Sequence, residues 1–184
     1  MRKLIFAINM SLDGYCNHDN PKFTPDAELM DYFTQLVGGA GAFVYGRITY
    51  ELMVPYWPDM AKNPSGNKAD DDYARAFDSV EKIVVFSKSL NSVEGKNTEI
   101  AHTSLQDTIL KLKQEDGKDI LTGGVNIPLQ LIELGLVDEY RFVIYPVVAG
   151  EGRKLFEDFS SLKLKLIESR TFISGCVVLR YVKE

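Results

Sequence analysis

Short apolar runs alternate with helix-like stretches along most of this chain. The strand-like runs are residues 3–9, 42–45, 83–86, 120–121, 142–148 and 176–182. The helix-like stretches are residues 25–37, 48–53, 70–77, 105–114 and 128–134. Strands that alternate with helices form parallel sheets, and nearly continuous apolar strands are typical of a sheet covered on both faces. The pattern therefore predicts an α/β fold, a three-layer α/β/α sandwich around a mostly parallel central sheet.

The C-terminal third departs from this alternation. Residues 162–170 and 172–182 are both strand-like, and no helix separates them. Ser174 and Gly175 lie within the connection and permit a tight turn. We therefore expect a C-terminal antiparallel hairpin added to the parallel sheet.

Two earlier segments carry local expectations. Thr24 is a suitable cap for the helix at 25–37, and Pro25 suits its first turn. Residues 55–68 contain several prolines and a glycine, so they are expected to form one long loop. Long loops in compact domains are often lids or binding segments.

Length and charge limit the class of protein. A chain of 184 residues suits one hydrophobic core, so we expect a single domain over residues 1–184. The formal net charge is −5 with acidic and basic residues interspersed, which argues against nucleic acid or an anionic membrane as partner. The N-terminal apolar run is too short for a signal peptide, and no run reaches the ~20 residues that span a bilayer. A cytoplasmic protein is expected.

Metal ligands and disulfide partners are sparse. The chain has two cysteines, Cys16 and Cys176, and two histidines, His18 and His102, with no CxxC spacing. We therefore expect neither a zinc site nor a disulfide.

Two of the strand-like runs end in residues that suit a bound anion. Gly46 and Arg47 follow one run and open the next helix-like stretch. Glycine allows close backbone approach, the N–H groups of a helix start favour anions, and an arginine holds phosphate with its fork of donors. Ser87 and Lys88 follow another run in the same way. For either segment taken alone, a plain turn with solvated charges is the alternative.

A third run ends in paired glycines. Gly123 and Gly124 follow Thr122 and precede a helix-like stretch that Pro128 opens. Paired glycines let a flat ring or a diphosphate lie directly on the backbone, although the segment is neither a GxGxxG fingerprint nor a P-loop. Ligands gather at the carboxyl ends of strands in open α/β sheets. The three segments together predict a dinucleotide across that edge.

Five segments in this order resemble a known family. They are SLDG at 11–14, GRITYE at 46–51, FSKS at 86–89, TGG at 122–124 and GLVDEYRFVIYPVVAGEGRKLF at 135–156. They are similar to bacterial dihydrofolate reductase-like proteins that share the reductase domain of the riboflavin-biosynthesis deaminase/reductase. The resemblance implies a dihydrofolate reductase-like fold and an NADPH-dependent oxidoreductase that acts on a C=N or C=O group.

The resemblance also implies which residues contact NADPH. At the start of the helix after the second strand, NADPH would be contacted by Gly46, Arg47, Ile48 and Thr49. Ser87 and Lys88 would lie beside the adenosine 2′-phosphate, where two cations explain a preference for NADPH over NADH. The diphosphate and nicotinamide would be lined by Gly123, Gly124 and Val125.

Four residues are candidates for the substrate side. Asp13, in a loop that borders the substrate in relatives, is expected to orient the substrate or relay a proton, with an Asp-Gly turn as the alternative. Glu28 best fits the acid that folate enzymes place on the first helix, although acids are common near helix N-termini. Tyr56 and Trp57 are candidates to stack on a flat heterocycle or to fix their segment to the core.

The resemblance leaves the substrate open. Residues 79–82 lack the arginine that grips the folate glutamate tail, and residues 51–58 lack the acidic segment that holds a ribosyl phosphate in the riboflavin branch. The SLDG and GLVDE segments favour 5-amino-6-(5-phosphoribosylamino)uracil reduction first, with a dihydrofolate or pterin reductase, or a reductase of another small heterocycle, as the alternative. A non-catalytic NADP-binding protein is the alternative of a different class. Relatives pair, so a homodimer is expected, with residues 140–148 as a candidate interface.

Overall fold

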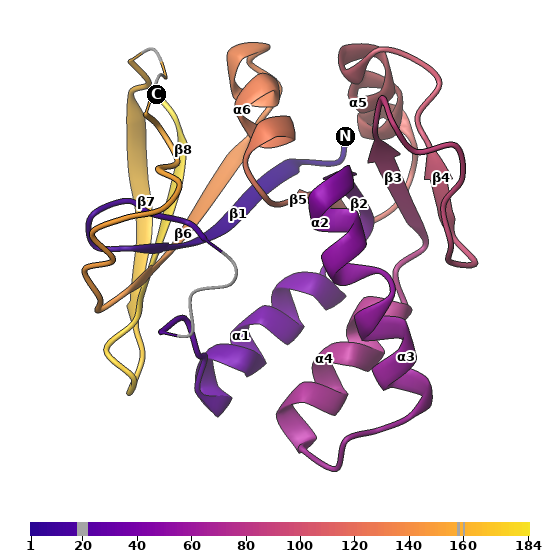
Figure 1. The fold of residues 1–184 in the computed structure, drawn as a ribbon. Helices are drawn as coiled ribbons and strands as arrows, with labels where there is room; N and C mark the ends of the chain where they lie inside the picture. The colour runs from indigo at the N-terminus through magenta and orange to yellow at the C-terminus, as the bar shows by residue number, and fades with distance from the viewer. Residues whose placement is uncertain (18–21, 158, 160) are drawn as a thin grey trace.

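The computed structural model describes residues 1–17, 22–157, 159 and 161–184, and His18 lies outside these ranges. Its eight described strands form one sheet in the order β4-β3-β2-β5-β1-β6-β8-β7 (Figure 1). The strands are β1 (Leu4–Ser11), β2 (Ala40–Gly46), β3 (Lys82–Phe86), β4 (Thr98–Ile100), β5 (Asp119–Thr122), β6 (Glu139–Tyr145), β7 (Leu164–Thr171) and β8 (Val177–Lys183). Neighbours among β1 to β6 are parallel, and β8 is antiparallel to both β6 and β7. The predicted parallel sheet with a C-terminal hairpin is confirmed.

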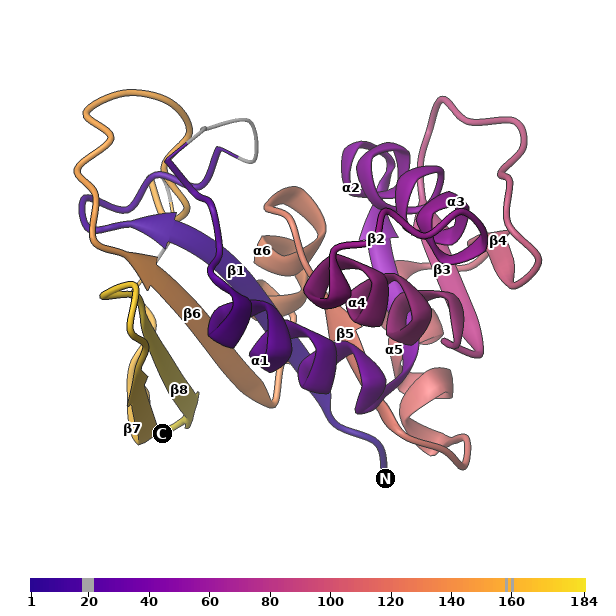
Figure 2. The ribbon, with the colours of Figure 1, turned by 90° about the horizontal axis from the view of Figure 1, so that it is seen from below.

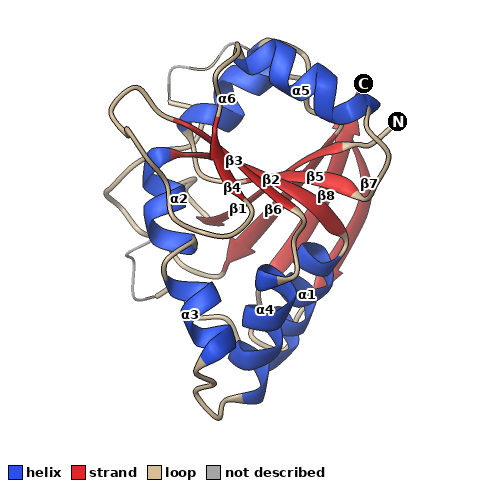
Figure 3. Ribbon diagram, turned by 90° about the vertical axis from the view of Figure 1, so that its right-hand side faces the viewer, coloured by secondary structure: helices blue, strands red, loops and turns tan. Residues whose placement is uncertain are grey.

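Helices cover both faces of the sheet. They are α1 (Ala27–Gly38), α2 (Arg47–Met53), α3 (Tyr56–Lys62), α4 (Lys68–Asp78), α5 (Leu105–Gln114) and α6 (Asn126–Glu133). Figure 3 shows α5 and α6 on one side of the sheet and α1, α3 and α4 on the other. Figure 2 looks onto the side with α1 and α4. The arrangement is the predicted three-layer sandwich.

Side-chain alternation along β1 divides the core into two layers. Leu4 and Phe6 point toward the layer that also contains Leu131 of α6, whereas Ile5 points toward the layer that contains Phe77 of α4. Successive side chains of a strand face opposite sides of the sheet, so an unbroken apolar strand supplies both layers. Across the α4 layer, the rings of Phe43 and Phe77 lie 5.0 Å apart.

The first helix begins later than predicted. Asp26, rather than Thr24, is its N-cap, because its side chain accepts a hydrogen bond from the Leu29 N–H at 2.8 Å. Pro25 therefore precedes the helix. The cap fixes the start of α1 beside the C-terminal hairpin, since the second Asp26 oxygen accepts the Ser174 N–H at 3.0 Å.

The expected long loop at 55–68 is wrong over half its length. Residues 56–62 form α3, which tolerates Pro58 because a proline in the first turn of a helix leaves no hydrogen bond unmade. The short strand β4 was not expected, since its sequence TEI has no apolar run. The sixth strand ends at Tyr145 rather than at residue 148, because Pro146 has no N–H to continue pairing.

Cys16 and Cys176 are both free thiols. Within the described residues, no cluster of three or more histidine, cysteine, aspartate or glutamate side chains is arranged to hold a metal ion. Among the same residues, no helix has the length and apolar character to cross a membrane.

Candidate functional site

The carboxyl ends of three parallel strands, β2, β3 and β5, lie together at one edge of the sheet, and β1 continues past them to Ser11. Gly46, the last residue of β2, pairs with Phe86, the last residue of β3. On the other side of β2, Val44 pairs with Thr122 at the end of β5. Thr122 also pairs with Phe6 of β1. The segments predicted to bind a dinucleotide therefore leave the sheet side by side.

The glycine turns after β2 and β5 lie in close contact. Gly124 has φ +81°, and a Cβ placed on it would lie 2.3 Å from Thr49 Oγ1. A Cβ on Gly46 would lie 3.2 Å from Ile127 Cγ1. Only glycine fits such approaches without displacing a neighbour. The structure thus packs the start of α2 against the start of α6, with Ile127 and Thr49 in the space that a side chain would take.

Arg47 points to solvent at this edge. Its side chain is 45% exposed, and its Nη1 lies 2.9 Å from Oε2 and 3.1 Å from Oε1 of Glu51, one turn along α2. Exposed ion pairs of this kind contribute little stability. Arg47 can therefore exchange Glu51 for a phosphate at small cost. The neighbouring Ile48 is exposed, and Thr49 is half-buried against Gly124.

The turn after β3 is organised by Ser87. Its Oγ accepts the N–H groups of Ser89 at 3.1 Å and Leu90 at 3.0 Å, which folds the chain back after Phe86. The following side chain, Lys88, is exposed. The turn presents a hydroxyl and an ammonium group next to the end of β2.

Asp13 joins two loops at the end of β1. Its carboxylate accepts hydrogen bonds from the Ser11 hydroxyl at 2.6 Å, the Ala149 N–H at 2.9 Å and the Gly150 N–H at 2.8 Å. These bonds, the one from Ser11 foremost, stabilise the charged form and lower the pKa of Asp13 to about 2. Asp13 is therefore a carboxylate at neutral pH, and its bonds hold the loop after β6 against the loop after β1.

Glu28 contacts the C-terminal hairpin. One oxygen lies 3.3 Å from Arg170 Nη2 of β7, and the other accepts the Ile173 N–H at 3.1 Å. With Asp26 on Ser174, the first turn of α1 fastens the β7–β8 turn. The contacts of Glu28 are thus with the hairpin.

The two aromatic candidates differ in exposure. The Trp57 ring packs 4.4 Å from the Tyr73 ring of α4, which fixes α3 to the core. Tyr56 is 54% exposed and meets the Trp57 ring edge-on at 4.9 Å. Tyr56 is thus the more exposed of the two rings.

Sequence reasoning missed Arg153 as a site residue. The loop that carries it runs antiparallel to the loop after β1 through a Tyr15–Lys154 bridge, and the Cys16 N–H donates to the Arg153 carbonyl at 2.9 Å. The Arg153 guanidinium then donates to the Asn126 side chain at the start of α6. This places a further cation beside the paired glycines. The GEGRK segment contains this arginine, but no local pattern indicates that its partner is Asn126, 27 residues earlier in the chain.

A hollow of about 310 Å³ lies beside these loops. Its lining residues are Met10, Gly14, Lys154, Leu155, Phe156 and Glu157. It adjoins the end of β1 on the α6 side of the sheet, since Met10 and Leu155 pack in that core layer.

The strand order, the C-terminal hairpin and the glycine-rich edge define a reductase domain of the dihydrofolate reductase-like class. A family model described as the RibD C-terminal domain matches residues 2–178, and the chain belongs to this family. The predicted family resemblance is confirmed. Reductases of the family typically use NAD(P)H.

Individual relatives agree with this membership. A Bacillus subtilis (strain 168) protein named Uncharacterized protein YyaP is 33% identical over 187 residues, covering 98% of this chain and 94% of YyaP. Two crystal structures share the fold. A pyrimidine reductase-like protein from Corynebacterium diphtheriae has a TM-score of 0.66 at 17% identity and coverage of 100% of this chain and 92% of that one.

The second structure is longer than this chain. It is a diaminohydroxyphosphoribosylaminopyrimidine deaminase/5-amino-6-(5-phosphoribosylamino)uracil reductase from Thermotoga maritima, with a TM-score of 0.68 at 14% identity. The match covers 100% of this chain and 57% of that one. This chain thus corresponds in fold to little more than half of the Thermotoga protein.

Proposed function

We propose that the protein is an NADPH-dependent reductase of a planar nitrogen heterocycle. One observation carries the proposal: Arg47 and Lys88 follow the adjacent ends of β2 and β3, next to the Gly123–Gly124 turn that follows β5. Glycine approaches suit a diphosphate and a flat ring, and the two cations suit a 2′-phosphate.

The residues present fit the cofactor. Gly123, Gly124 and Val125 would line its diphosphate and nicotinamide, with Arg47 and Thr49 across the turn. Ser87 and Lys88 would take the 2′-phosphate. When bound, NADPH supplies a hydride. The chain's own contribution is to orient the reactants and keep the groups that surround them fixed.

We assign Asp13 a positioning role. A carboxylate whose pKa is about 2 is a poor proton donor at neutral pH, and its oxygens already accept three hydrogen bonds. It holds the two loops that border the substrate in the proposed site. We assign Glu28 a positioning role as well, because its bonds hold the start of α1 against the hairpin.

Among substrates, we place 5-amino-6-(5-phosphoribosylamino)uracil first. The SLDG and GLVDE segments support this choice, as do the names of the Corynebacterium and Thermotoga proteins. Residues 79–82 contain no arginine for a folate tail. Tyr56 is our candidate to stack on a heterocycle, because it is 54% exposed whereas Trp57 packs on Tyr73.

A non-catalytic NADP-binding protein is the second candidate. The observation that favours it is the engagement of both predicted acids, Asp13 and Glu28, in bonds that fasten loops. Such a protein would keep the cofactor edge and lack turnover.

Titration with NADPH and NADH, followed by absorbance decay at 340 nm after adding substrate, tests the proposal. Tight NADPH binding and oxidation by the deaminated riboflavin precursor would support the first candidate. Oxidation by dihydrofolate would instead assign a pterin reductase. Binding without oxidation by either substrate favours the non-catalytic protein, and absence of NADPH binding contradicts both candidates.

We also propose a homodimer and a cytoplasmic location. Strand β6 lies between β1 and β8 within one chain, so its backbone is not available for the interface suggested at residues 140–148. The edge strand β7 is a better candidate, since Leu166 and Ile167 are 48% and 44% exposed. An exposed apolar edge strand invites pairing with another copy.

A further inference from the structure

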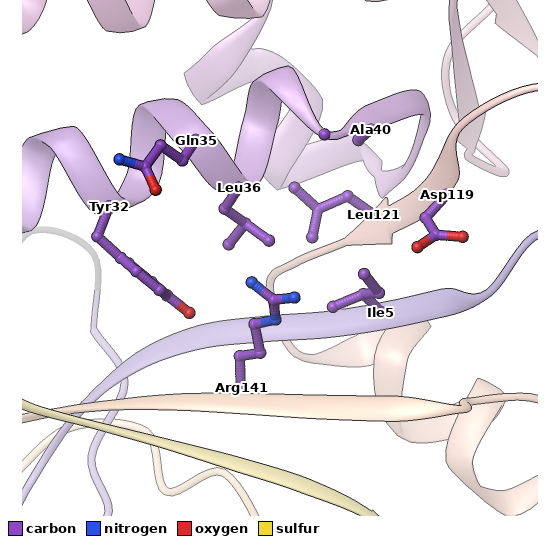
Figure 4. A pocket seen from close by; sticks show the side chains of 9 residues that line it. Ile5, Tyr32, Gln35, Leu36, Ala40, Asp119, Leu121 and Arg141 are labelled. Carbon is purple, nitrogen blue, oxygen red and sulfur yellow. The ribbon is translucent and has the colours of Figure 1, made fainter. Parts of the chain in front are cut away.

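A second cavity lies under α1, outside the proposed cofactor edge. It has a volume of about 200 Å³ and is lined by Tyr32, Gln35 and Leu36 from α1, together with residues from four strands (Figure 4). The strand residues are Ile5, Ala40, Asp119, Leu121 and Arg141. At about 200 Å³ the cavity is smaller than the roughly 300–1,000 Å³ of typical ligand pockets, so it suits a small fragment rather than a dinucleotide.

The cavity is at the amino-terminal ends of the strands. Ala40 and Asp119 are the first residues of β2 and β5, and Ala40 pairs with Asp119. Gly46 of the cofactor edge is the last residue of β2. Six residue steps of about 3.3 Å separate the two ends, roughly 20 Å. A ligand in the cavity would therefore be distinct from one at the cofactor edge.

Arg141 brings an incompletely neutralised charge into this space. Its side chain is 18% exposed, and its Nε donates to Glu139 Oε1 at 2.8 Å. Glu139 is the one carboxylate that Arg141 contacts in the described part of the chain. Arg180 binds both oxygens of Glu139, at 2.7 and 3.0 Å. Lys3 Nζ also lies 3.9 Å from Glu139, and Arg180 has a second carboxylate partner in Glu168 at 2.9 Å. Arg141 thus shares its one carboxylate with two other cations, and Figure 4 shows its guanidinium pointing into the cavity.

Tyr32 provides a second polar group beside Arg141. Its hydroxyl is buried beside Arg141, whose guanidinium can only donate, so the hydroxyl hydrogen has no acceptor among the described residues. Burial raises the pKa of Tyr32, and the nearby Arg141 charge partly opposes this effect. A buried hydroxyl without a good partner costs free energy, so an acceptor in the cavity would stabilise it.

The remaining walls define the shape and charge of the ligand. Ile5, Leu36 and Leu121 are buried apolar side chains that suit a flat hydrocarbon ring. Asp119, whose Oδ1 accepts the Lys3 N–H at 2.8 Å, adds negative charge at the far end. The Asp119 carboxylate would repel a doubly charged phosphate more strongly than a singly charged carboxylate. The site therefore favours a monocarboxylate held at the Arg141 end.

We infer that this cavity binds a small aromatic monocarboxylate, with its carboxylate on Arg141 and Tyr32 and its ring between Leu36 and the sheet. Planar carboxylates pair with guanidinium groups through two parallel hydrogen bonds. The inference concerns a site separate from the proposed reductase activity.

Benzoate is the probe for the test, with benzamide as its uncharged counterpart of the same shape. Calorimetric titration of the cofactor-free protein should show benzoate binding at least about tenfold more tightly than benzamide. In ¹⁵N-labelled protein, benzoate should shift the amide signals of Ile5 and Leu121 and leave those of Gly46 and Gly124 in place. NADPH failing to bind would count against the proposed function alone.

Matched variants separate binding from folding. Arg141→Met and Arg180→Met each remove one guanidinium from Glu139, but only Arg141 lines the cavity. Arg141→Met should weaken benzoate at least about tenfold, whereas Arg180→Met should weaken it less, because the Arg141 guanidinium is still present although Glu139 then pairs with it more fully. Tyr32→Phe should weaken it by a smaller factor.

Three results would overturn the inference. They are no saturable benzoate binding, equal affinity for benzoate and benzamide, and equal loss of affinity in the two arginine variants. Inorganic phosphate binding more tightly than benzoate, with the same dependence on Arg141, would replace the proposed ligand class.

Discussion

Gly124 shows at the scale of one residue how the candidate site is held together. Its backbone has φ +81°, a conformation that residues other than glycine rarely adopt. It also lies so close to Thr49 that there is no room for a Cβ. Paired glycines after a strand predicted a bare backbone here. The sequence did not reveal that Thr49, 75 residues earlier in the chain, would be the neighbour, because the contact depends on how β2 and β5 pair.

Gly124→Ala should lower the free energy of unfolding by about 1–3 kcal/mol and weaken NADPH binding, because the new Cβ meets Thr49 in a strained backbone. Denaturant midpoints and cofactor titration measure both effects. Gly66→Ala is the control, since φ there is +86° with no atom within 4 Å. Adding Thr49→Ala should recover the steric part of the stability loss. Equal effects at Gly66 and Gly124 would contradict the contact.

Arg47→Ala combined with Lys88→Ala should weaken NADPH by ~1–3 kcal/mol for each lost charged hydrogen bond and affect NADH much less. The reason is that only NADPH carries the 2′-phosphate. Fluorescence titration with both cofactors measures the difference. Lys165→Ala, on exposed β7, removes a cation far along the chain from these strand ends and should leave both affinities unchanged. Equal losses of affinity for NADPH and NADH would contradict the assignment of Arg47 and Lys88 to the 2′-phosphate.

Asp13 gives a prediction for low pH. Its folded-state pKa of about 2 lies below the ordinary value of 3.8. The ionised carboxylate therefore contributes stability above about pH 4, and this contribution is lost as the pH falls through 2. Asp13→Asn should be less stable than wild type at pH 7 and approach it at acid pH. A constant gap in urea midpoints from pH 7 to pH 2 would contradict this.

At the scale of elements, the long periodic segments were predicted best. Helix α5 has the predicted bounds of 105–114, since its apolar residues recur at helical spacing and Ser104 caps it. Helix α3 was missed because its prolines suggested a loop, and β4 because three residues carry no periodicity. Both depend on tertiary contacts: Trp57 packs on Tyr73, and β4 pairs with β3.

Asp26 both caps α1 and holds the hairpin turn, and a comparison of two variants distinguishes these roles. Asp26→Ala removes an N-cap, at a cost of about 1 kcal/mol, and also releases the Ser174 N–H of the hairpin turn. Asn67→Ala removes only the cap of α4. Hydrogen exchange should accelerate at residues 173–175 in the first variant and not in the second. Unchanged exchange at the turn in both variants would contradict the tether.

At the scale of the whole molecule, the family resemblance predicted more than the local patterns did. Strand alternation indicated the layers, but the order β4-β3-β2-β5-β1-β6-β8-β7 depends on pairings across the entire chain. The adjacency of the strand ends that carry the proposed cofactor residues could be predicted, because glycines and cations follow the strands directly. The loop contacts at Asp13 and Arg153 could not, since each joins residues whose spacing carries no local signal. The single domain over 1–184 stays a prediction.

The mass in solution and a variant of the edge strand β7 together test the proposed homodimer. Size-exclusion chromatography with light scattering should give twice the chain mass of 20.7 kDa. Ile167→Lys should shift the protein toward the monomer, because a lysine on an edge strand opposes pairing. Lys165→Glu on the same strand keeps a charge there and serves as the control. A monomer at all concentrations of the wild-type protein would remove the proposal.

The insertion of β8 between β6 and β7 has a consequence for how the chain is made. β7 leaves the ribosome before β8, but β8 is its partner in the sheet. Until β8 has emerged, the exposed β7 segment has no place to dock, and the side of β6 that β8 covers stays open. Nascent chains with unpaired strands are prone to aggregation. The emergence of β8 therefore completes this part of the sheet, and a pause in synthesis before residue 177 would leave β7 and one side of β6 unpaired.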